Sequence, residues 1–322
     1  MKRNQKVLVA GAGGFIGHHL VKFLKTKGYF VRGVDIKKPE YEKTSANEFL
    51  LLDLRKKSNA LTATKDMDHV YNLAANMGGI GFIETVHAEL MHDNVLIDTN
   101  MLETARANGV KRFFYSSSAC IYPIYKQGKK RNPGLKESDA YPADPDNSYG
   151  WEKLFIERLC FDYYQDHGLE TRVARFHNIY GPLGAWQGGR EKSPAAICRK
   201  IAQAKNGNTI EVWGDGKQTR SYCYINDCLK GIYKLMMSDI RHPLNIGSTQ
   251  LVSINELIDI VAKIAGKKIK KKYDLSKPQG VRGRNSDNTL IKKLLHWEPS
   301  IKLEEGIKQT YKWIKIQTEK TA

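Results

Sequence analysis

The sequence predicts an α/β fold: a doubly wound parallel sheet with a smaller C-terminal α/β substrate-binding lobe. Short apolar runs alternate with helical patterns from Lys6 to about Pro182, which is typical of parallel strand–helix–strand units. Beyond Pro182 this alternation becomes irregular, which indicates a second lobe. We expect residues 1–178, with about 222–247, to form the first domain, and residues 179–221 and 248–322 to form the lobe.

Composition limits the function classes. The chain has 322 residues, of which 41% are hydrophobic, so it can bury a sizeable core and is neither disordered nor collagen-like. A net charge of +18 can attract nucleic acid, membranes or an anionic small substrate. Much of the basic excess lies in 126–131 and 267–284, and neither stretch is an RNA-binding motif or an amphipathic membrane helix. We therefore expect no specific nucleic-acid or membrane partner.

Cysteine usage and the first residues bear on location. The cysteines show neither C-x-x-C nor disulfide spacing and suit a reducing compartment, so a cytoplasmic protein without a metal is expected. Met1–Lys6 is basic and Val7–Ala10 is apolar, as in a signal peptide, but the apolar run is short and continues into glycines. A strand followed by a phosphate-binding loop is the better interpretation. No apolar run of transmembrane length occurs.

The first strand–helix–strand unit predicts dinucleotide binding. Lys6–Ala10 reads as a strand, glycines follow at 11, 14 and 17, a helix spans His18–Lys27, and Tyr29–Val34 is the next strand. Glycines let the backbone approach a pyrophosphate, and the helix N-terminus offers free N–H groups. Asp35, at the end of the second strand, can bond a ribose hydroxyl and favours NAD. NADP stays open because Arg32 and Lys37 are nearby.

Two more strands are expected at Leu50–Leu54 and Asp68–Ala75. Asp53 would lie near the adenine or act as a loop acid or helix cap. The small residues at the end of the second strand let a backbone pass close to the cofactor. The glycine-rich stretch Asn76–Gly81 can close over a substrate or merely turn the chain.

A strand at Val110–Tyr115 leads to the predicted centre of the site. It runs into a small polar loop, Ser116–Pro123, and open α/β sheets bind ligands at the carboxyl ends of their strands. The preceding helix, Asn94–Asn108, carries an apolar stripe that suits either the core or a dimer face.

A tyrosine and a lysine share one face of the next helix, Ser148–His167. Tyr149 and Lys153 are four residues apart. A lysine beside a phenol lowers the pKa of the phenol, so Tyr149 is a candidate base for a sugar hydroxyl. The alternative is an ordinary surface pair.

The remaining elements are expected in a fixed order. Ile124–Tyr141 is basic and reads as a surface loop. Further strands and helices are predicted at Thr171–Phe176, Ala195–Lys205, Thr209–Trp213, Ile225–Met237, Pro243–Ile246, Ile254–Ala265 and Asp287–Leu295.

From about Lys6 to Trp313 the chain resembles the extended short-chain dehydrogenase/reductase family, on its glycines, Ser118, Tyr149-x-x-x-Lys153 and Asn178. The resemblance implies a Rossmann-type domain that binds NAD. Ser118 and Tyr149 would bind the sugar 4-hydroxyl, and Lys153 the nicotinamide ribose. The implied cofactor residues are Gly11, Gly13, Gly14, Phe15, Ile16, Gly17, Asp35, Asp53, Leu54, Leu73, Ala74, Ala75, Tyr149 and Lys153.

The residues after Ser118 set the chemistry within this family, and this chain has Cys120 where dehydratases have an Asp-Glu pair. Several stretches are similar to those of the members that invert GDP-mannose at C3 and C5. They are 74–79, 117–123, 175–182, 188–192, 214–221 and 280–288. The chain departs from their pattern at Ser193 and in the Lys-rich loop 126–131.

The resemblance implies transient oxidation at C4, which acidifies the hydrogens on C3 and C5. Two acid/base groups must then flank the ring, and by resemblance these are Cys120 as base and Lys192 as acid. The products would be GDP-L-galactose and, from C5 inversion alone, GDP-L-gulose. Each residue has a plainer interpretation, Cys120 as a small buried hydrophobe and Lys192 as a surface charge.

The resemblance also implies the substrate contacts. They are Gly78, Gly79, Ser118, Cys120, Asn178, Glu191, Lys192, Lys200, Gln218, Arg220 and Arg282, with Lys200 and the two arginines on the diphosphate or guanine side. A homodimer through 94–108 and 149–166 is expected. The alternatives are another nucleotide-sugar 4- or 5-epimerase, and a cofactor-sensing or nucleic-acid-binding relative on the same fold.

Overall fold

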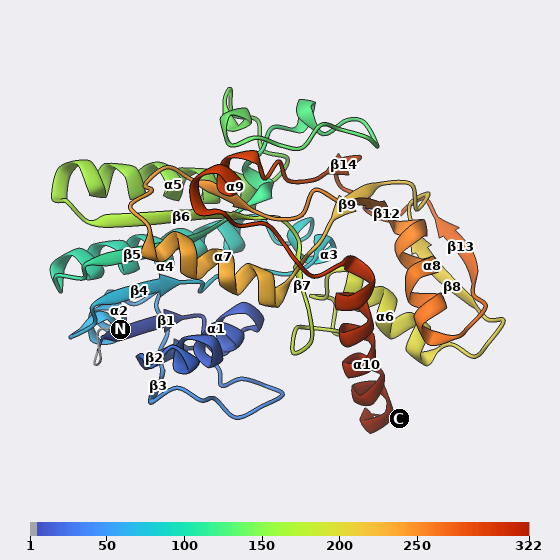
Figure 1. Cartoon of the computed structure of the whole chain (residues 1–322), viewed down its shortest axis with the longest axis horizontal. Helices are drawn as coiled ribbons and strands as arrows, with labels where there is room; N and C mark the ends of the chain where they lie inside the picture. The colour runs from blue at the N-terminus through green and yellow to red at the C-terminus, as the bar shows by residue number, and fades with distance from the viewer. Residues whose placement is uncertain (1–4, 322) are drawn as a thin grey trace.

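The computed structural model describes residues 5–321, and the first four residues of the basic N-terminal segment lie outside it. Within this range seven parallel strands form one twisted sheet (Figure 1). In spatial order they are β11 (Leu244–Ile246), β6 (Glu170–Phe176), β5 (Arg112–Ser118), β4 (His69–Asn72), β1 (Lys6–Ala10), β2 (Phe30–Asp35) and β3 (Glu48–Leu51). The predicted doubly wound α/β fold is confirmed.

Alternation along the strands creates a core on each face of the sheet. In β1, Val7 and Val9 pack into one buried cluster while Leu8 and Ala10 pack into the other. The first cluster includes residues of α1 (Phe15–Thr26) and α7 (Ile225–Met237). The second includes residues of α2 (Lys57–Thr64), α4 (Ala88–Ala107) and α5 (Ser148–His167). Because both faces are covered, the strands read as continuous apolar runs.

The lobe lies beside the carboxyl ends of the strands (Figure 1). Its helices are α6 (Ser193–Gln203), α8 (Ile254–Ala265) and α10 (Leu303–Thr321), and its paired strands are β8 (Thr209–Trp213) and β13 (Lys270–Asp274). A second small sheet has the order β12 (Leu251–Ser253), β9 (Thr219–Ser221) and β14 (Gly283–Arg284). The remaining α-helices and strands are α3 (Ile80–Ile83), α9 (Thr289–Leu295), β7 (Ile179–Tyr180) and β10 (Cys223–Tyr224), and three short 3₁₀ helices span Ala119–Ile121, Ile124–Lys126 and Glu137–Ala140.

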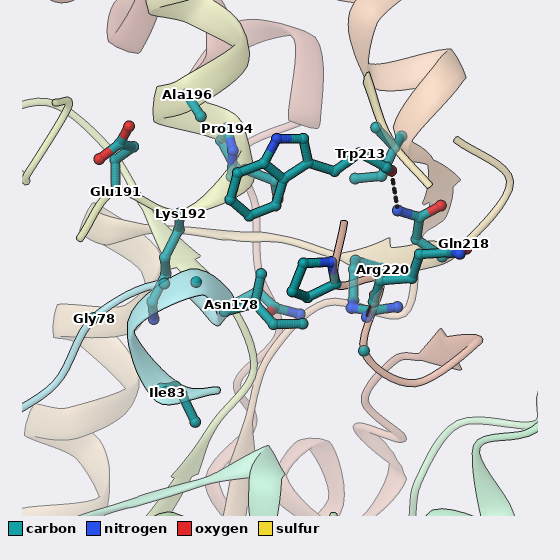
Figure 2. A pocket seen from close by; sticks show the side chains of 18 of the residues that line it. Gly78, Ile83, Asn178, Glu191, Lys192, Pro194, Ala196, Trp213, Gln218 and Arg220 are labelled. Atoms are coloured by element: carbon teal, nitrogen blue, oxygen red, sulfur yellow. Dashed lines mark hydrogen bonds between the residues drawn. The ribbon is translucent and has the colours of Figure 1, made fainter. Parts of the chain in front are cut away.

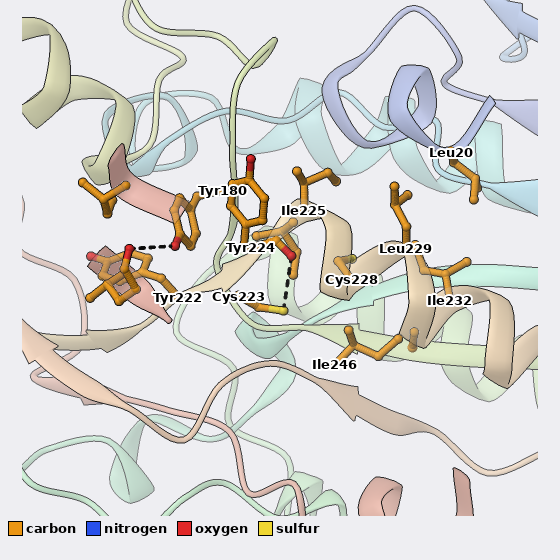
Figure 3. Packing of buried hydrophobic residues seen from close by; sticks show 14 of the residues in the cluster. Leu20, Tyr180, Tyr222, Cys223, Tyr224, Ile225, Cys228, Leu229, Ile232 and Ile246 are labelled. Carbon is orange, nitrogen blue, oxygen red and sulfur yellow. Dashed lines mark hydrogen bonds between the residues drawn. The ribbon is translucent and has the colours of Figure 1, made fainter. Parts of the chain in front are cut away.

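Tyrosines fill the junction between the sheet and the lobe. Tyr180 lies edge-on to both Tyr222 and Tyr224, with ring centroids 6.1 and 5.5 Å apart (Figure 3). The Tyr180 hydroxyl donates to the Leu303 carbonyl at the start of α10, which ties that helix to the junction. Among residues 5–321, no helix is long and apolar enough to cross a membrane.

Several expectations about local structure were wrong. Strand β5 continues through Ser118, so the serines are strand residues and not loop residues. Helix α4 begins at Ala88, six residues before the expected start. The segment 124–141 is not simply a surface loop, because its residues Gln127 and Leu135 are buried. The sequence reading also missed β13, a lysine-rich strand without an apolar alternation, and α10.

Candidate active site

A cavity of about 330 Å³ opens at the carboxyl ends of β5 and β6, between these strands and the lobe. In Figure 2, Lys192, Glu191 and Gly78 lie on one side, Trp213, Gln218 and Arg220 on the other, and Asn178 between them. The cavity brings together nearly all the predicted substrate residues: Gly78, Gly79, Ser118, Cys120, Asn178, Glu191, Lys192, Lys200, Gln218 and Arg220. Its place agrees with the general position of ligand sites in open α/β sheets.

Cys120 lies just beyond the carboxyl end of β5, and neighbouring residues fix its backbone. Its backbone N–H donates to the Ser118 hydroxyl at 3.1 Å, which leaves the hydroxyl hydrogen of Ser118 free to donate to a ligand. The first turn of α5 packs directly on this segment, because a Cβ at Gly150 would lie 2.2 Å from the Cys120 carbonyl. This close approach places Tyr149, which precedes Gly150, in one apolar cluster with Cys120.

Lys192 is positioned in the cavity by a different segment of the chain. It precedes α6, and its loop is pinned to the 76–81 segment by a hydrogen bond from Gly79 N to Arg190 O at 3.0 Å. A Cβ at Gly79 would lie 2.3 Å from the Glu191 carbonyl, so the two loops touch backbone to backbone. Burial lowers the pKa of Lys192, which brings its ammonium group toward the range useful for acid/base chemistry.

Tyr149 and Lys153 meet on the inner face of α5. Both are buried, and the Lys153 ammonium lies 5.6 Å from the Tyr149 ring centroid. Burial raises the pKa of Tyr149, and the nearby Lys153 opposes that rise. The expected lowering by Lys153 is therefore present, but burial outweighs it.

The structure adds an arginine that the sequence reading did not single out. Arg284 lines the cavity, and one guanidinium N–H donates to the Cys120 sulfur at 3.2 Å. A second N–H donates to Asp146 at 3.2 Å. Strand pairing explains its place, because Arg284 lies directly opposite Arg220 in the β14–β9 register. Burial and the neighbouring Arg284 lower the pKa of Arg220 to about 10, as expected for two cations that share one site.

Arg282 is placed differently. Its guanidinium pairs with Asp215 at 2.7 and 2.9 Å, and it is not among the described residues that line the cavity. The motif 280–288 contains both arginines, and nothing in the sequence shows which of them faces the site.

Other predicted substrate residues are anchored at the cavity wall. Arg199 donates to Glu191 at 2.8 Å, and Asn178 donates to the Ser221 carbonyl at 2.9 Å. Lys200 donates to the Glu211 carbonyl at 2.8 Å, and Gln218 to the Trp213 carbonyl at 3.2 Å.

Ser193, where the chain departs from its family pattern, forms a hydrogen bond with the Tyr222 hydroxyl at 2.9 Å.

The β1–α1 loop has the form that a dinucleotide pyrophosphate needs. A Cβ at Gly13 would lie 2.1 Å from the Lys37 carbonyl, and one at Gly17 would lie 2.0 Å from the Gly11 carbonyl. No side chain caps the N-terminus of α1, so its first N–H groups face the loop. Asp35 accepts from Gly13 N at 2.9 Å and keeps further lone pairs for a ribose. These residues fit a dinucleotide.

Of the remaining predicted cofactor residues, Leu73 and Ala74 border the same loop. Leu73 N donates to the Ala10 carbonyl at 3.1 Å, which brings the chain after β4 beside Gly11. Arg32, the reason for keeping NADP open, is paired with Glu48 at 2.7 Å. Asp53 pairs with Arg55 at 2.9 Å, as a loop acid does, and its contact with adenine stays a prediction.

Comparison with known proteins gives the family. A model of the NAD dependent epimerase/dehydratase family matches residues 7–247. The chain is 52% identical over 319 residues to a GDP-mannose 3,5-epimerase of Arabidopsis thaliana, covering 98% of this chain and 84% of that protein.

Two solved structures are also similar. A UDP-glucose 4-epimerase from Thermotoga maritima with UDP-glucose has a TM-score of 0.87 at 25% identity, covering 98% of this chain and all of that one. A UDP-glucuronic acid 4-epimerase from Bacillus cereus, in complex with UDP-glucuronic acid and NAD, has a TM-score of 0.83 at 26% identity, covering 97% and 100%. With the family model and the full-length relative in agreement, the chain belongs to the NAD-dependent epimerase/dehydratase family.

Proposed function

We propose that this protein is an NAD-dependent isomerase that inverts C3 and C5 of GDP-mannose, giving GDP-L-galactose, with GDP-L-gulose from inversion at C5 alone. The observation that carries this proposal is the placement of Cys120 and Lys192 in one cavity beside Ser118. Two proton-transfer groups on different elements suit an inversion, which needs a proton removed from one face and returned to the other. The full-length similarity to a GDP-mannose 3,5-epimerase supports the same substrate.

The chain's own residues supply the proton transfers at C4. The chemistry that NAD supplies when bound is the reversible removal of hydride from C4. Tyr149 accepts the proton of the C4 hydroxyl, and Lys153 favours the resulting phenolate. Ser118 holds the same hydroxyl through the hydrogen that its contact with Cys120 leaves free.

The 4-ketone makes the hydrogens on C3 and C5 acidic, and Cys120 removes them in turn. Lys192 returns a proton from the opposite side, helped by a pKa that burial lowers. Arg284 holds the Cys120 sulfur in place, since one of its guanidinium N–H groups donates to that atom at 3.2 Å. Arg284 and Arg220 together make this part of the cavity cationic and suited to a diphosphate.

The substrate is tested by incubating the purified protein with GDP-mannose, UDP-glucose or UDP-glucuronic acid and separating the products by chromatography. We expect new GDP-hexoses from GDP-mannose and no product from the UDP-sugars. Conversion of a UDP-sugar to its C4 epimer, with GDP-mannose unchanged, would instead establish the 4-epimerase alternative. Weak, salt-dependent binding to random DNA without any turnover would favour the non-enzymatic alternative.

Comparing Arg284→Gln with Arg282→Gln tests which of the two arginines binds the diphosphate. The place of Arg284 in the cavity favours Arg284, whereas the sequence predicted Arg282. A charged hydrogen bond contributes about 1.5–3 kcal/mol, so Arg284→Gln should weaken binding of GDP-mannose roughly 10- to 100-fold. Arg282→Gln removes only the pair with Asp215 and should change affinity much less. Isothermal calorimetry measures both dissociation constants. The reverse order would show that Arg282 is the diphosphate ligand.

We also propose a homodimer formed through α4 and α5. Helix α5 exposes Trp151 and Phe155, which are 45% and 49% accessible and four residues apart, on one face. Light scattering should give twice the chain mass, and Trp151→Glu should lower it toward the monomer. Leu275→Glu, at an exposed apolar residue of the lobe, is the matched control. A monomeric wild-type protein would contradict the proposal.

A reducing, cytoplasmic location is proposed from the free cysteines.

A further inference from the structure

Three charged side chains lie buried together beneath the Tyr149–Lys153 pair. Lys153, Asp98 and Glu152 are each at most 1% exposed. The Lys153 ammonium lies 3.3 Å from an Asp98 oxygen and 3.4 Å from a Glu152 oxygen. One cation therefore faces two carboxyl groups in a site closed to water, and the mechanism above uses neither carboxyl.

Asp98 is fully engaged. It accepts from Asn72 at 2.7 Å, from the Tyr115 hydroxyl at 3.1 Å and from Lys153. In all three contacts Asp98 acts as an acceptor, the role that carboxylate oxygens fill.

Glu152, in contrast to Asp98, lacks well-placed hydrogen-bond donors among residues 5–321. Neither of its oxygens has a well-formed hydrogen bond from the described residues, although both are buried. A carboxylate can only accept, and the Asp98 carboxylate beside it also only accepts. A proton on Glu152 satisfies both groups, since the acid can then donate to Asp98.

We propose that Glu152 and Asp98 share one proton beneath Lys153, and that this acid–carboxylate pair is a positioning device for the Tyr149–Lys153 couple. With one shared proton the two carboxyl groups carry a single negative charge, which balances the positive charge of Lys153. Lys153 then stays fixed beside the Tyr149 ring. Two ionised carboxyl groups would leave the buried site with a net negative charge, which opposes the phenolate that Tyr149 must form.

The electrostatics of the surroundings agree with this arrangement. Burial raises the pKa of Glu152 to about 8, Asp98 adds to the rise, and Lys153 opposes it. The other titratable groups that face the cluster are Tyr115, Tyr149 and Cys160, and burial raises the pKa of each. Cys120 faces Tyr149, and Glu157 near Cys160 is paired with Arg175 at 2.7 Å.

The test is thermal unfolding of the purified holoenzyme against pH, with Glu152→Gln as the variant. Glutamine imitates the protonated acid, since it can donate to Asp98 and accept from Lys153. In the wild type the unfolded chain ionises Glu152 above its usual pKa of about 4.5, while the folded protein keeps the proton until about pH 8. The wild type therefore loses stability across this window and E152Q does not. The Tm of E152Q minus that of the wild type should rise by several degrees from about pH 5 to pH 8 and then level off.

Asp98→Asn completes a double-mutant cycle. Without the neighbouring carboxylate, Glu152 should ionise and pair with Lys153, so E152Q in the D98N background should now destabilise the protein. If E152Q does not fold, D98N alone still tests the proposal. The Tm of D98N minus that of the wild type should also rise from about pH 5 to pH 8. Asp162→Asn, on the exposed side of α5, is the control and should show no such pH dependence.

A Tm difference for E152Q that is constant with pH, or equal in the D98N background, would overturn the shared proton. This readout does not require turnover, so its failure is distinct from failure of the proposed function, on which the catalytic consequence rests. The wild-type rate of epimerisation should fall above about pH 8, and the rate of E152Q should not. The ratio of the rates at alkaline and neutral pH measures this difference. An equal fall in both proteins would contradict the role in positioning Lys153.

Discussion

Cys120→Ser is expected to abolish deuterium incorporation into GDP-mannose in D₂O, while Lys192→Met is expected to allow incorporation without inversion. The difference follows from their proposed roles. A serine hydroxyl is a much weaker base than a thiolate, so no proton leaves C3 or C5, and the rate should fall by about 10²-fold or more. Without Lys192, Cys120 still removes a proton and returns a deuteron to the same face.

The controls for this pair use other residues of the same cavity. Lys200→Met removes a cavity lysine that bonds the Glu211 carbonyl, and it should weaken binding without changing the labelling pattern. Reduced cofactor, seen by its absorbance on addition of GDP-mannose, should still form in both Cys120→Ser and Lys192→Met. Deuterium at C3 and C5 in Cys120→Ser at the wild-type rate would show that another group is the base.

Tyr149→Phe is expected to stop the reaction one step earlier than either of these variants. The change removes only a hydroxyl from a buried ring, so the fold should persist, but the C4 hydroxyl loses its proton acceptor. We expect the rate of cofactor reduction to fall by about 10²- to 10⁴-fold. Stopped-flow absorbance after mixing with GDP-mannose measures it directly.

Tyr141→Phe provides the comparison for Tyr149→Phe. Tyr141 is 61% exposed on the 124–141 segment, and removal of its hydroxyl should leave cofactor reduction at the wild-type rate. Normal cofactor reduction in Tyr149→Phe would exclude Tyr149 as the base, and Ser118, which lines the cavity, would be the next residue to test.

Local patterns predicted the elements that carry the chemistry. Helix α5 and strand β8 have the bounds expected from the sequence. Helix α5 has a clear start at the Asn147 cap and a clear end at Gly168, and β8 alternates buried and exposed residues. The β1–loop–α1 unit was also predictable, since Gly14 and Gly17 are required by close approaches to the Gly11 carbonyl within the same loop. Cys120 and Lys192 were found by family resemblance and could not be paired from spacing.

What the sequence did not show depends on long-range pairing. Arg284 enters the cavity because a two-residue strand, β14, pairs with β9, and so short a strand has no detectable period. Asp98 lies on a helix that was read by its apolar stripe, so a buried acid on the same helix gave no signal. Glu152 adjoins Lys153 in the sequence, but its burial without a well-formed hydrogen bond is visible only in three dimensions.

In the proposed mechanism, one cavity inverts two carbons through C4 oxidation and two opposed proton-transfer groups. The most direct test is incubation of the wild-type protein with GDP-mannose in D₂O, followed by NMR of the recovered sugars. We predict deuterium at both C3 and C5, in products of galactose and gulose configuration. Turnover without deuterium at either carbon would contradict this mechanism, and Cys120 and Lys192 would then be structural residues.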